Sequence, residues 1–186
     1  NEVLSTNPKI LNGTVTETAE SDKGTIEFKN VSFKYPDASD YVLRDISFKA
    51  EKGKTIAFIG ATGSGKSTLI NLIPRFYDAT DGDVLVDGVN VKEYDIESLN
   101  NKLGYVPQKA VMFSGTVSSN VAYGNNGRDN YSADDIKQAI KIAQGTEFVE
   151  KMENQYEGAI AQGGSNISGG QKQRLAIARA VCRKPE

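Results

Sequence analysis

Residues 58–68, FIGATGSGKST, have the residue types and the spacing that bind a phosphate chain, G-x-x-x-x-G-K-[ST]. Glycines let consecutive backbone N–H groups turn inward around anionic oxygens, and a following helix adds its free N–H groups and its dipole. Lys66 reaches the outer phosphates, and the hydroxyl of Ser67 is a ligand for Mg²⁺. The predicted nucleotide-binding residues of this loop are Gly60, Thr62, Gly63, Ser64, Gly65, Lys66, Ser67 and Thr68. By itself the loop leaves a kinase, a GTPase and an ATPase open.

A second glycine pair, Gly169 and Gly170, lies where the segment NISGGQKQRLAIARAV begins a helical apolar repeat. Ser168 and Gln171 have capping-box spacing, so we expect a helix to begin here. Each glycine in a first turn costs up to about 1 kcal/mol relative to alanine, but the bare helix end is accessible to a large anion. An ordinary capped helix stays open as an alternative. Because the chain already has one phosphate loop, a second anion-binding helix end suggests the triphosphate of a second molecule.

The first half of the chain is expected to form strands around the phosphate loop. Residues 25–35 alternate between apolar and polar, with a shift between Phe28 and Val31, and residues 42–50 repeat the alternation. Residues 55–60, TIAFIG, are apolar throughout, which predicts a strand buried on both faces. A hairpin turn is predicted where Asp-Gly interrupts DVLVDGVNV.

Helices are expected in the second half, and a linker at the start. The segment SADDIKQAIKIAQG opens with Ser132 and Asp135 in capping-box spacing, and Gly145 occupies the expected C-cap. Residues 1–23 are polar, with turn-prone pairs at Asn7-Pro8 and Asn12-Gly13, and predict a linker or a loosely held arm.

With both glycine motifs present, the chain from about residue 25 onward resembles the ATP-binding domains of ABC transporters. NISGGQKQRLAIARAV is similar to their signature motif, with Ile167 where leucine is usual. VSFKYP resembles the A-loop, and GYVPQKAVMFSGTVSSNVAYG resembles the Q-loop and the segment after it. FKYPD and VLRDISF, combined with MFSGTVSSNVAYG, resemble the exporter branch, in which the ATPase domain follows six membrane helices on the same chain.

The resemblance implies roles for residues whose types alone decide little. It places Tyr35 against the adenine ring, although an ordinary strand aromatic is equally compatible with that position. It places Gln108 in contact with Mg²⁺ and the attacking water, and implies that Gln108 also signals the state of the site to the membrane domain. From its residue type alone, the default for Gln108 is a solvated loop glutamine. Two domains would dimerise head to tail, so that one caps the ATP on Lys66 of the other. The capping residues are Ser168, Gly169, Gly170 and Gln171.

The implied fold is α/β, a P-loop NTPase core with an N-terminal antiparallel β subdomain and a helical subdomain. We expect a linker from an upstream membrane domain at 1–23, the β subdomain and core at 24–108, the helical subdomain with the signature at 109–176, and a return to the core at 177–186. The implied cofactors are ATP and Mg²⁺. The implied partners are a second ATP-binding domain, in a homodimer or heterodimer, and the transmembrane domain of the same chain, at the cytoplasmic face of the cell membrane.

Two departures from the family pattern qualify this expectation. Exporters usually carry Glu and Arg before the signature, whereas Gln162 and Gly163 stand here, which resembles one half of bacterial heterodimeric exporters with unequal ATP sites. Family members also continue after a Lys-Pro pair with the Walker B strand, whose Asp and Glu serve Mg²⁺ and water, and with a later histidine. Neither follows Glu186, and the chain has no histidine. We therefore expect a domain truncated before Walker B, which alone binds nucleotide weakly and hydrolyses little ATP.

Composition narrows the remaining classes. With 22 basic and 24 acidic residues the net charge is −2, so nucleic acid is not an expected partner. A single cysteine, Cys182, excludes an internal disulfide and fits a reducing compartment. No run approaches the roughly 18 apolar residues of a membrane span. A soluble ABC-type ATPase without a transport role and a small-molecule kinase remain alternatives, and the kinase would have no use for Gly169-Gly170.

Overall fold

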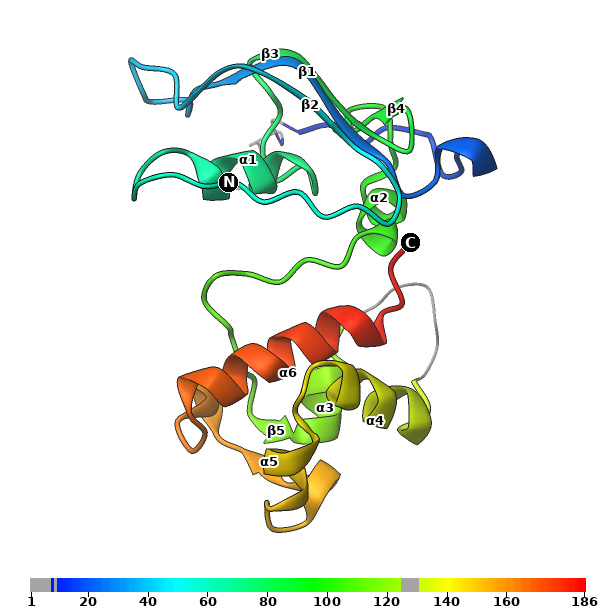
Figure 1. Cartoon of the computed structure of the whole chain (residues 1–186), viewed down its shortest axis with the longest axis vertical. Coiled ribbons are helices and arrows are strands. Elements are labelled where there is room, and N and C mark those ends of the chain that lie inside the picture. The colour runs from blue at the N-terminus through cyan, green and yellow to red at the C-terminus, as the bar shows by residue number, and fades with distance from the viewer. Residues whose placement is uncertain (1–7, 9, 125–130) are drawn as a thin grey trace, which may run out of the picture. The chain divides into compact units, whose positions relative to one another are not determined.

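The structure, a computed structural model, describes residues 8, 10–124 and 131–186. It divides into two compact units (Figure 1). Unit 1 comprises Asn1–Asn100 with Glu186, and unit 2 comprises Asn101–Pro185. The helical subdomain was expected to begin at residue 109, whereas unit 2 begins at Asn101. The Asn7-Pro8 turn and residues 1–7 of the expected linker lie outside the described residues.

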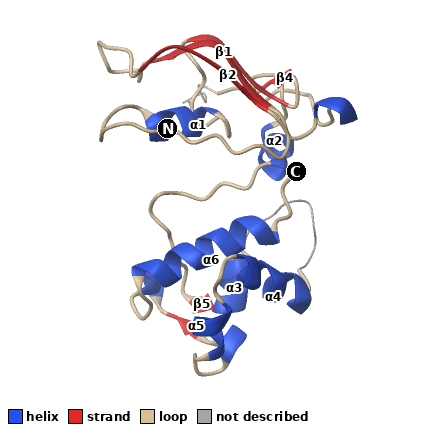
Figure 2. Cartoon of the chain, in the orientation of Figure 1, coloured by secondary structure: helices blue, strands red, loops and turns tan. Residues whose placement is uncertain are grey.

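Unit 1 is built on an antiparallel sheet in the order β2-β1-β3-β4. The strands are β1 (Ile26–Phe33), β2 (Leu43–Ala50), β3 (Asp81–Val86) and β4 (Val89–Asn90) (Figure 2). The predicted shift in β1 is confirmed, because its pairing with β2 is irregular between Phe28 and Val31, and Asn30 has φ 49°. As a result Phe28, Val31 and Phe33 are all buried without strict alternation.

The predicted hairpin is confirmed. Val86 pairs with Val89, so Asp87 and Gly88 form a two-residue turn with φ values of 51° and 75°. Two positive φ values are typical of a type I′ turn, whose twist matches that of the strands. Asp87 is also buried and accepts a hydrogen bond from the backbone of Gly24 at 2.8 Å. This bond ties the turn to the segment that precedes β1.

The buried strand predicted at residues 55–60 is wrong in this structure. The segment forms no ladder with any described residue, and Ile56 and Ile59 are 40% and 98% exposed. A central strand exists only when neighbouring strands satisfy its backbone groups and cover its two faces. The described part of the chain supplies no such neighbour. By contrast, the helix predicted after the loop is confirmed as α1 (Lys66–Leu72), which lies on one side of the sheet (Figure 1).

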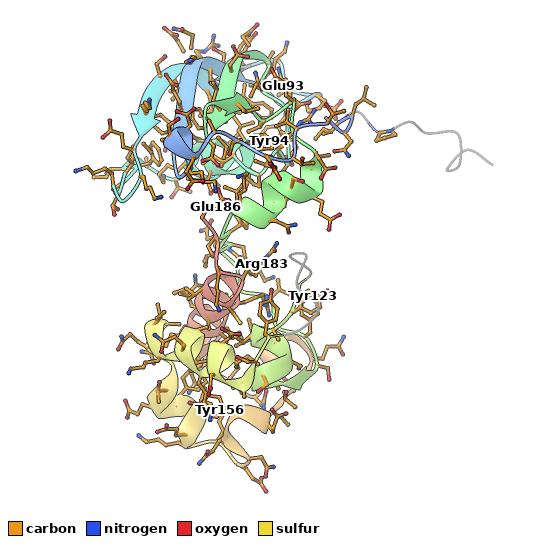
Figure 3. The ribbon with its side chains drawn as sticks, turned by 90° about the vertical axis from the view of Figure 1, so that its right-hand side faces the viewer. Glu93, Tyr94, Tyr123, Tyr156, Arg183 and Glu186 are labelled. Carbon is orange, nitrogen blue, oxygen red and sulfur yellow. The ribbon has the colours of Figure 1, made fainter. Side chains whose placement is uncertain are left out.

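The N-terminal arm is fixed to unit 1 near its Asn12-Gly13 pair, so the expectation of a loose arm is wrong there. The backbone N–H of Gly13 donates to the carbonyl of Tyr94 at 2.9 Å, and Tyr94 is fully buried (Figure 3). The side-chain oxygen of Asn12 accepts from the first N–H of α2 (Ile96–Lys102) at 2.7 Å. A Cβ at Gly13 would lie 2.1 Å from the carbonyl oxygen of Glu93. The close approach of the two backbones therefore requires glycine.

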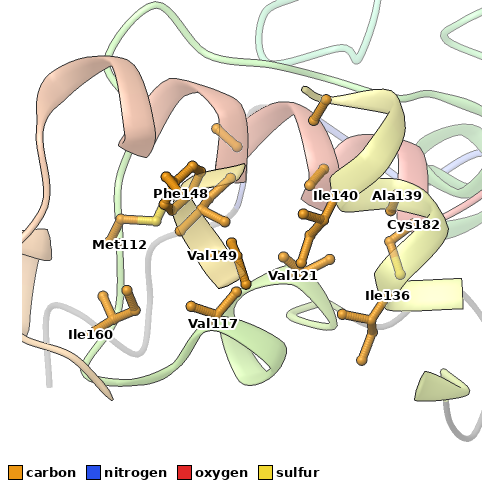
Figure 4. Close-up of a cluster of buried hydrophobic side chains, with 14 residues drawn as sticks. Met112, Val117, Val121, Ile136, Ala139, Ile140, Phe148, Val149, Ile160 and Cys182 are labelled. Carbon is orange, nitrogen blue, oxygen red and sulfur yellow. The ribbon is translucent and has the colours of Figure 1, made fainter. Parts of the chain in front are cut away.

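Unit 2 is helical. Its elements are β5 (Gly115–Thr116), α3 (Val117–Val121), α4 (Ala133–Ile142), α5 (Thr146–Glu150), β6 (Ala159–Ile160) and α6 (Gly169–Cys182). β5 pairs antiparallel with β6, and α6 packs along α3 and α4 (Figure 1). One apolar core joins these elements (Figure 4). Its larger members are Met112, Val117, Val121, Ile136, Ile140, Phe148, Val149, Ile160 and Leu175.

The helix α4 begins as predicted and ends differently. Ser132 Oγ accepts from the backbone of Asp135 at 3.1 Å, and Asp135 accepts from the backbone of Ser132 at 3.2 Å, which confirms the capping box. At the C-terminus the left-handed residue is Gln144, with φ 56°, and not Gly145. Gly145 donates to the carbonyl of Ile140 at 2.8 Å, as in a Schellman motif. Glycine fits there because a Cβ would lie 3.2 Å from the Ile140 side chain.

Candidate functional site

The lysine of the phosphate loop is bound by the loop itself. Lys66 Nζ donates to the carbonyl oxygens of Gly60 at 2.8 Å and Ala61 at 2.7 Å, and to Ser64 Oγ at 3.2 Å. The ammonium group is therefore hydrogen-bonded only to neutral oxygens of its own loop in these three contacts. Charged phosphate oxygens are stronger hydrogen-bond partners for an ammonium than neutral oxygens are. The lysine is thus placed to exchange these bonds for a phosphate.

Two glycines give the loop its shape. Gly63 and Gly65 have φ values of 83° and 86°, in the left-handed region that glycine adopts without steric cost. Gly65 is the N-cap of α1, and a Cβ there would lie 2.9 Å from the side chain of Leu43. Thr62 and Ser67, the residue predicted to bind Mg²⁺, are both exposed.

The aromatic residue expected at the adenine is joined to the helix of the phosphate loop. The hydroxyls of Tyr35 and Thr68 are 3.0 Å apart and share a hydrogen bond, and Thr68 is buried. The ring of Tyr35 meets Phe33 and Tyr77 edge-on, with centroids 5.0 and 5.3 Å away. The structure thus brings Tyr35 together with the loop that spans Gly60 to Thr68. Sequence reasoning did not single out Tyr77, which contacts Tyr35 only in the folded unit.

A cavity of about 520 Å³ lies against the same aromatic group. Its walls are mainly apolar, and the phosphate loop does not line it. The lining residues are Pro8, Ile10, Phe33, Lys34, Pro36, Phe76, Tyr77 and Asp78. The carboxylate of Asp78 forms an ion pair with Arg75 at 2.7 Å, whereas the charge of Lys34 has no partner among the lining residues. Because no residue of the phosphate loop lines it, the cavity is separate from the predicted triphosphate site.

The glycine pair of unit 2 lies at an open helix end. Ser168 Oγ accepts from the backbone of Gln171 at 3.2 Å, and the side chain of Gln171 accepts from the backbone of Ser168 at 2.8 Å. The predicted capping box is confirmed, and α6 begins at Gly169. Gly169 and Gly170 are exposed, and nothing lies within 4 Å of the position of a Cβ on either. This mouth of α6, residues 168–171, can be approached closely from outside.

The segment that contains Gln108 belongs to unit 2 and leads to an aromatic surface. Gln108 itself is exposed, between α2 and β5. Further along, the rings of Phe113 and Tyr123 stack with centroids 4.1 Å apart. They are 40% and 52% exposed, and Figure 3 labels Tyr123. Sequence reasoning did not single out this aromatic pair, because the two residues are ten positions apart and become neighbours only when α3 folds.

These features define a P-loop nucleotide-binding domain: a glycine loop that begins a helix, its lysine held inside the loop, and an aromatic side chain hydrogen-bonded to that helix. The family model described as ABC transporter matches residues 43–186. The chain therefore belongs to the ABC transporter family.

Individual relatives refine this assignment. The chain is 44% identical over 97% of its length to an ATP-dependent lipid A-core flippase of Haemophilus influenzae, and covers 30% of that protein. It is 48% identical over 87% of its length to an uncharacterized ABC transporter ATP-binding protein of Bacillus subtilis, and covers 28% of it. The solved structure of a bacterial Atm1-family ABC exporter with ATP bound matches with a TM-score of 0.88 and 33% identity over 99% of this chain and 32% of that one.

The matches confirm the α/β P-loop fold with an antiparallel β subdomain and helices, and they identify an ATP-binding domain of the exporter type. The chain spans about a third of the length of these relatives. Within the described ranges, none of the helices has both the length and the apolar character that a membrane crossing requires.

Proposed function

We propose that the chain binds MgATP and, in the whole exporter, hydrolyses it at a head-to-tail interface of two ATP-binding domains to drive transport across a membrane. The observation that carries this proposal is the mouth of α6, where Gly169 and Gly170 are exposed and have open space at the position of a Cβ. A triphosphate held on Lys66 of one domain would be capped by Ser168, Gly169 and Gly170 of the other. Helix N-termini favour such anionic groups.

The residues of the chain would divide the work of binding. Backbone N–H groups of residues 62–65 would hold the phosphates, and Lys66 would exchange its carbonyl partners for the outer phosphate oxygens. Tyr35 would stack on adenine, kept in place by its bond to Thr68. The remaining contacts of the loop would come from Gly60, and Gln108 would orient the attacking water.

Mg²⁺ would be held by Ser67 and Gln108, together with phosphate oxygens and water. Hydroxyl and amide oxygens fit this hard cation, and both side chains are exposed to receive it. When bound, the ion neutralises charge that develops on the phosphates.

The second partner we propose is a membrane domain, which would place the chain at the cytoplasmic face of the cell membrane. The relatives named as a flippase and an exporter support this partner. So does the aromatic surface of Phe113 and Tyr123, because exposed apolar patches mark contact sites for proteins or lipids. A soluble ABC-type ATPase is the competing function, and it would leave this surface uncovered.

Calorimetry on the full-length protein tests the phosphate site. Lys66→Ala is expected to weaken the binding of ATP at least tenfold more than the binding of AMP, because the ammonium group would contact only the outer phosphates. Lys54→Ala, an exposed lysine outside residues 58–68, is the matched control and should change neither affinity. Equal losses for ATP and AMP would contradict the assignment.

The same titration tests the adenine contact. Tyr35→Ala should weaken the binding of ATP about tenfold or more, because stacking of a base on an aromatic side chain contributes about 1–3 kcal/mol. Tyr35→Phe keeps the ring and loses only the hydrogen bond to Thr68, so it should cost less than tenfold. Wild-type affinity in the alanine variant would remove Tyr35 from the site.

A further inference from the structure

Tyr77 belongs to the aromatic group that contacts Tyr35. Its ring lies perpendicular to the ring of Tyr35, with centroids 5.3 Å apart, and meets the ring of Phe33 at 52°, with centroids 5.5 Å apart. The rings of Phe33 and Tyr35 are also close to perpendicular, with centroids 5.0 Å apart. Edge-to-face pairs at such distances are favourable. The three rings therefore form a closed triangle, in which each ring contacts the other two.

The triangle restricts a rotation that the hydrogen bond of Tyr35 leaves open. The bond to Thr68 holds the hydroxyl oxygen of Tyr35 at 3.0 Å. That oxygen lies on the axis about which a tyrosine ring turns, and rotation about this axis is intrinsically soft. The bond therefore fixes where the ring ends but not which way its flat face points. Contacts at the side of the ring must decide that orientation, and Phe33 and Tyr77 supply them.

The two neighbours of Tyr35 differ in how deeply they are buried. Phe33 is 3% exposed and belongs to the core of unit 1, so its replacement would disturb the packing of the sheet. Tyr77 is 36% exposed, and its ring lies at the surface against both other rings. A change at Tyr77 can therefore release the ring of Tyr35 without opening the core of the unit.

The turn that carries Tyr77 is itself held by Arg75. Arg75 has φ 56°, and the N–H of Phe76 donates to the carbonyl of Asn71 at 3.1 Å, as in a Schellman motif after α1. Glycine is the usual residue at this left-handed position, but it has no side chain. The guanidinium of Arg75, 4% exposed, donates to both carboxylate oxygens of Asp78, at 2.7 and 3.3 Å. This pair spans the turn and fixes the backbone on both sides of Tyr77.

The helix of the phosphate loop thus contacts Tyr35 at two places. Thr68, near the start of α1, bonds its hydroxyl, and Tyr77, in the turn after α1, contacts its ring. The same helix begins with Lys66, the lysine of the phosphate loop. One short helix and its following turn therefore position both the lysine and the aromatic ring.

We propose that Tyr77 is a positioning residue for the nucleotide base, which holds the ring of Tyr35 in the orientation on which adenine stacks. The proposal rests on the function proposed above, in which Tyr35 is the residue that contacts adenine. Tyr77 acts through Tyr35 and does not contact the base. The ion pair of Arg75 and Asp78 keeps Tyr77 in place.

Calorimetry with ATP and with AMP on the full-length protein tests the proposal. Tyr77→Ala is expected to weaken the binding of both nucleotides by the same factor, about threefold to tenfold, because the aromatic contact is lost and both carry adenine. Tyr77→Phe keeps the ring and should bind both like the wild type. Tyr41→Ala is the matched control. Tyr41 is another partly exposed tyrosine of unit 1, but its ring contacts Arg44, so neither affinity should change.

A double-mutant cycle with Tyr35 separates positioning from a merely structural role. In a Tyr35→Ala background, Tyr77→Ala should cause no further loss of ATP affinity, because the ring that Tyr77 orients is already absent. A full further loss would overturn the proposal, since Tyr77 would then contact the base directly or act through the stability of unit 1.

A second variant covers the case in which Tyr77→Ala does not fold. Tyr77→Leu keeps an apolar side chain against Phe33 and loses the aromatic ring, so it should weaken the binding of both nucleotides about twofold or more. Wild-type affinity in a folded Tyr77→Ala or Tyr77→Leu variant would overturn the proposal, provided that Tyr35→Ala weakens ATP. If Tyr35→Ala itself binds ATP like the wild type, the adenine contact proposed above fails instead.

Discussion

The phosphate loop of unit 1 and the mouth of α6 in unit 2 both place glycines before a helix, but the fold depends on them differently. Gly63 and Gly65 have positive φ values, and Gly65 also lies against Leu43. At the mouth, Gly169 and Gly170 lie within the helix, with open space where a Cβ would be. Alanine would fit there and favour the helix. Replacement of the loop glycines should therefore cost stability, whereas the glycines of the mouth have no steric role within their own unit and fit the interface proposed above.

The two sites also differ in what supports them. The mouth continues into α6, whose Leu175, Ala178 and Cys182 are buried in the core of unit 2. The loop follows residues 55–60, which pair with no described strand and expose Ile59 almost completely. The mouth is therefore held by its own unit, while the segment that leads into the loop needs neighbours beside it. Variants at the two sites should separate folding effects from functional effects.

The largest effect is expected from Gly65→Ala. The variant combines a left-handed backbone, which costs about 1–2 kcal/mol for a residue with a Cβ, with a contact of 2.9 Å to Leu43, where overpacking costs about 1–3 kcal/mol. Unit 1 should lose about 3 kcal/mol of unfolding free energy, measured by hydrogen exchange of β1 and β3 with unit 2 as the internal reference. Gly63→Ala has the same backbone strain but open space, so it should lose only about 1–2 kcal/mol. Equal losses would show that contact with Leu43 does not matter.

A smaller effect is expected when either capping box is broken. Ser168→Ala and Ser132→Ala each remove a side-chain acceptor from a helix start, and each should cost about 1 kcal/mol of stability. Denaturant unfolding measures both losses. ATP turnover of the full-length protein distinguishes them, since only Ser168 belongs to the proposed interface. If Ser132→Ala reduced turnover as much as Ser168→Ala did, the loss would reflect stability and not contact with nucleotide.

Alanine at the mouth should act in the opposite direction on stability. Gly169→Ala and Gly170→Ala place a methyl group in open space and are expected to stabilise the helix by up to about 1 kcal/mol each. Turnover should nevertheless fall, because in the interface proposed above the methyl group would occupy the approach of the partner's triphosphate. Thermal unfolding measures the expected gain in stability, and phosphate release measures the expected loss of turnover. Destabilised variants would show that the mouth, like the loop, needs glycine for folding.

Features set by neighbours in sequence could be predicted. The capping boxes at Ser132 and Ser168 and the Asp87-Gly88 turn depend on residues a few positions apart, and the structure has all three. The phosphate loop and the helix after it are equally local. Short-range hydrogen bonds and φ preferences decide these elements before any tertiary contact forms.

Features set by distant partners could not be predicted. Asn12 caps a helix 84 positions away, and Arg179 bonds to Asn120 across 59 positions. The apolar run at 55–60 has the composition of a buried strand, but composition does not say whether neighbours are present to cover it. The interpretation of Gly145 as the C-cap failed more narrowly. The C-cap of α4 is Ala143, the left-handed residue is Gln144, and close packing on Ile140 explains the glycine.

The smallest predicted effect concerns pH and compares the two capping boxes. At the start of α4 the box contains a carboxylate, Asp135, whose pKa is lowered from 3.8 to about 2 by hydrogen bonds from Lys184, at 2.5 Å, and then from Ser132. At the start of α6 the corresponding residue is Gln171, which does not titrate. Because the folded pKa lies below the unfolded one, the carboxylate stabilises α4 fully above about pH 4, and this stabilisation is lost as the pH falls toward 2.

The first turn of α4 should therefore loosen between pH 4 and 2, while the first turn of α6 should not. Amide chemical shifts of residues 132–136 and 168–172, followed through an acid titration, measure the difference. Lys184→Ala removes the first cause of the shift, so it should move the midpoint for α4 upward, toward 3.8. Asp135→Asn should abolish the titration. If both helix starts changed together, general acid unfolding and not the Asp135 carboxylate would be responsible.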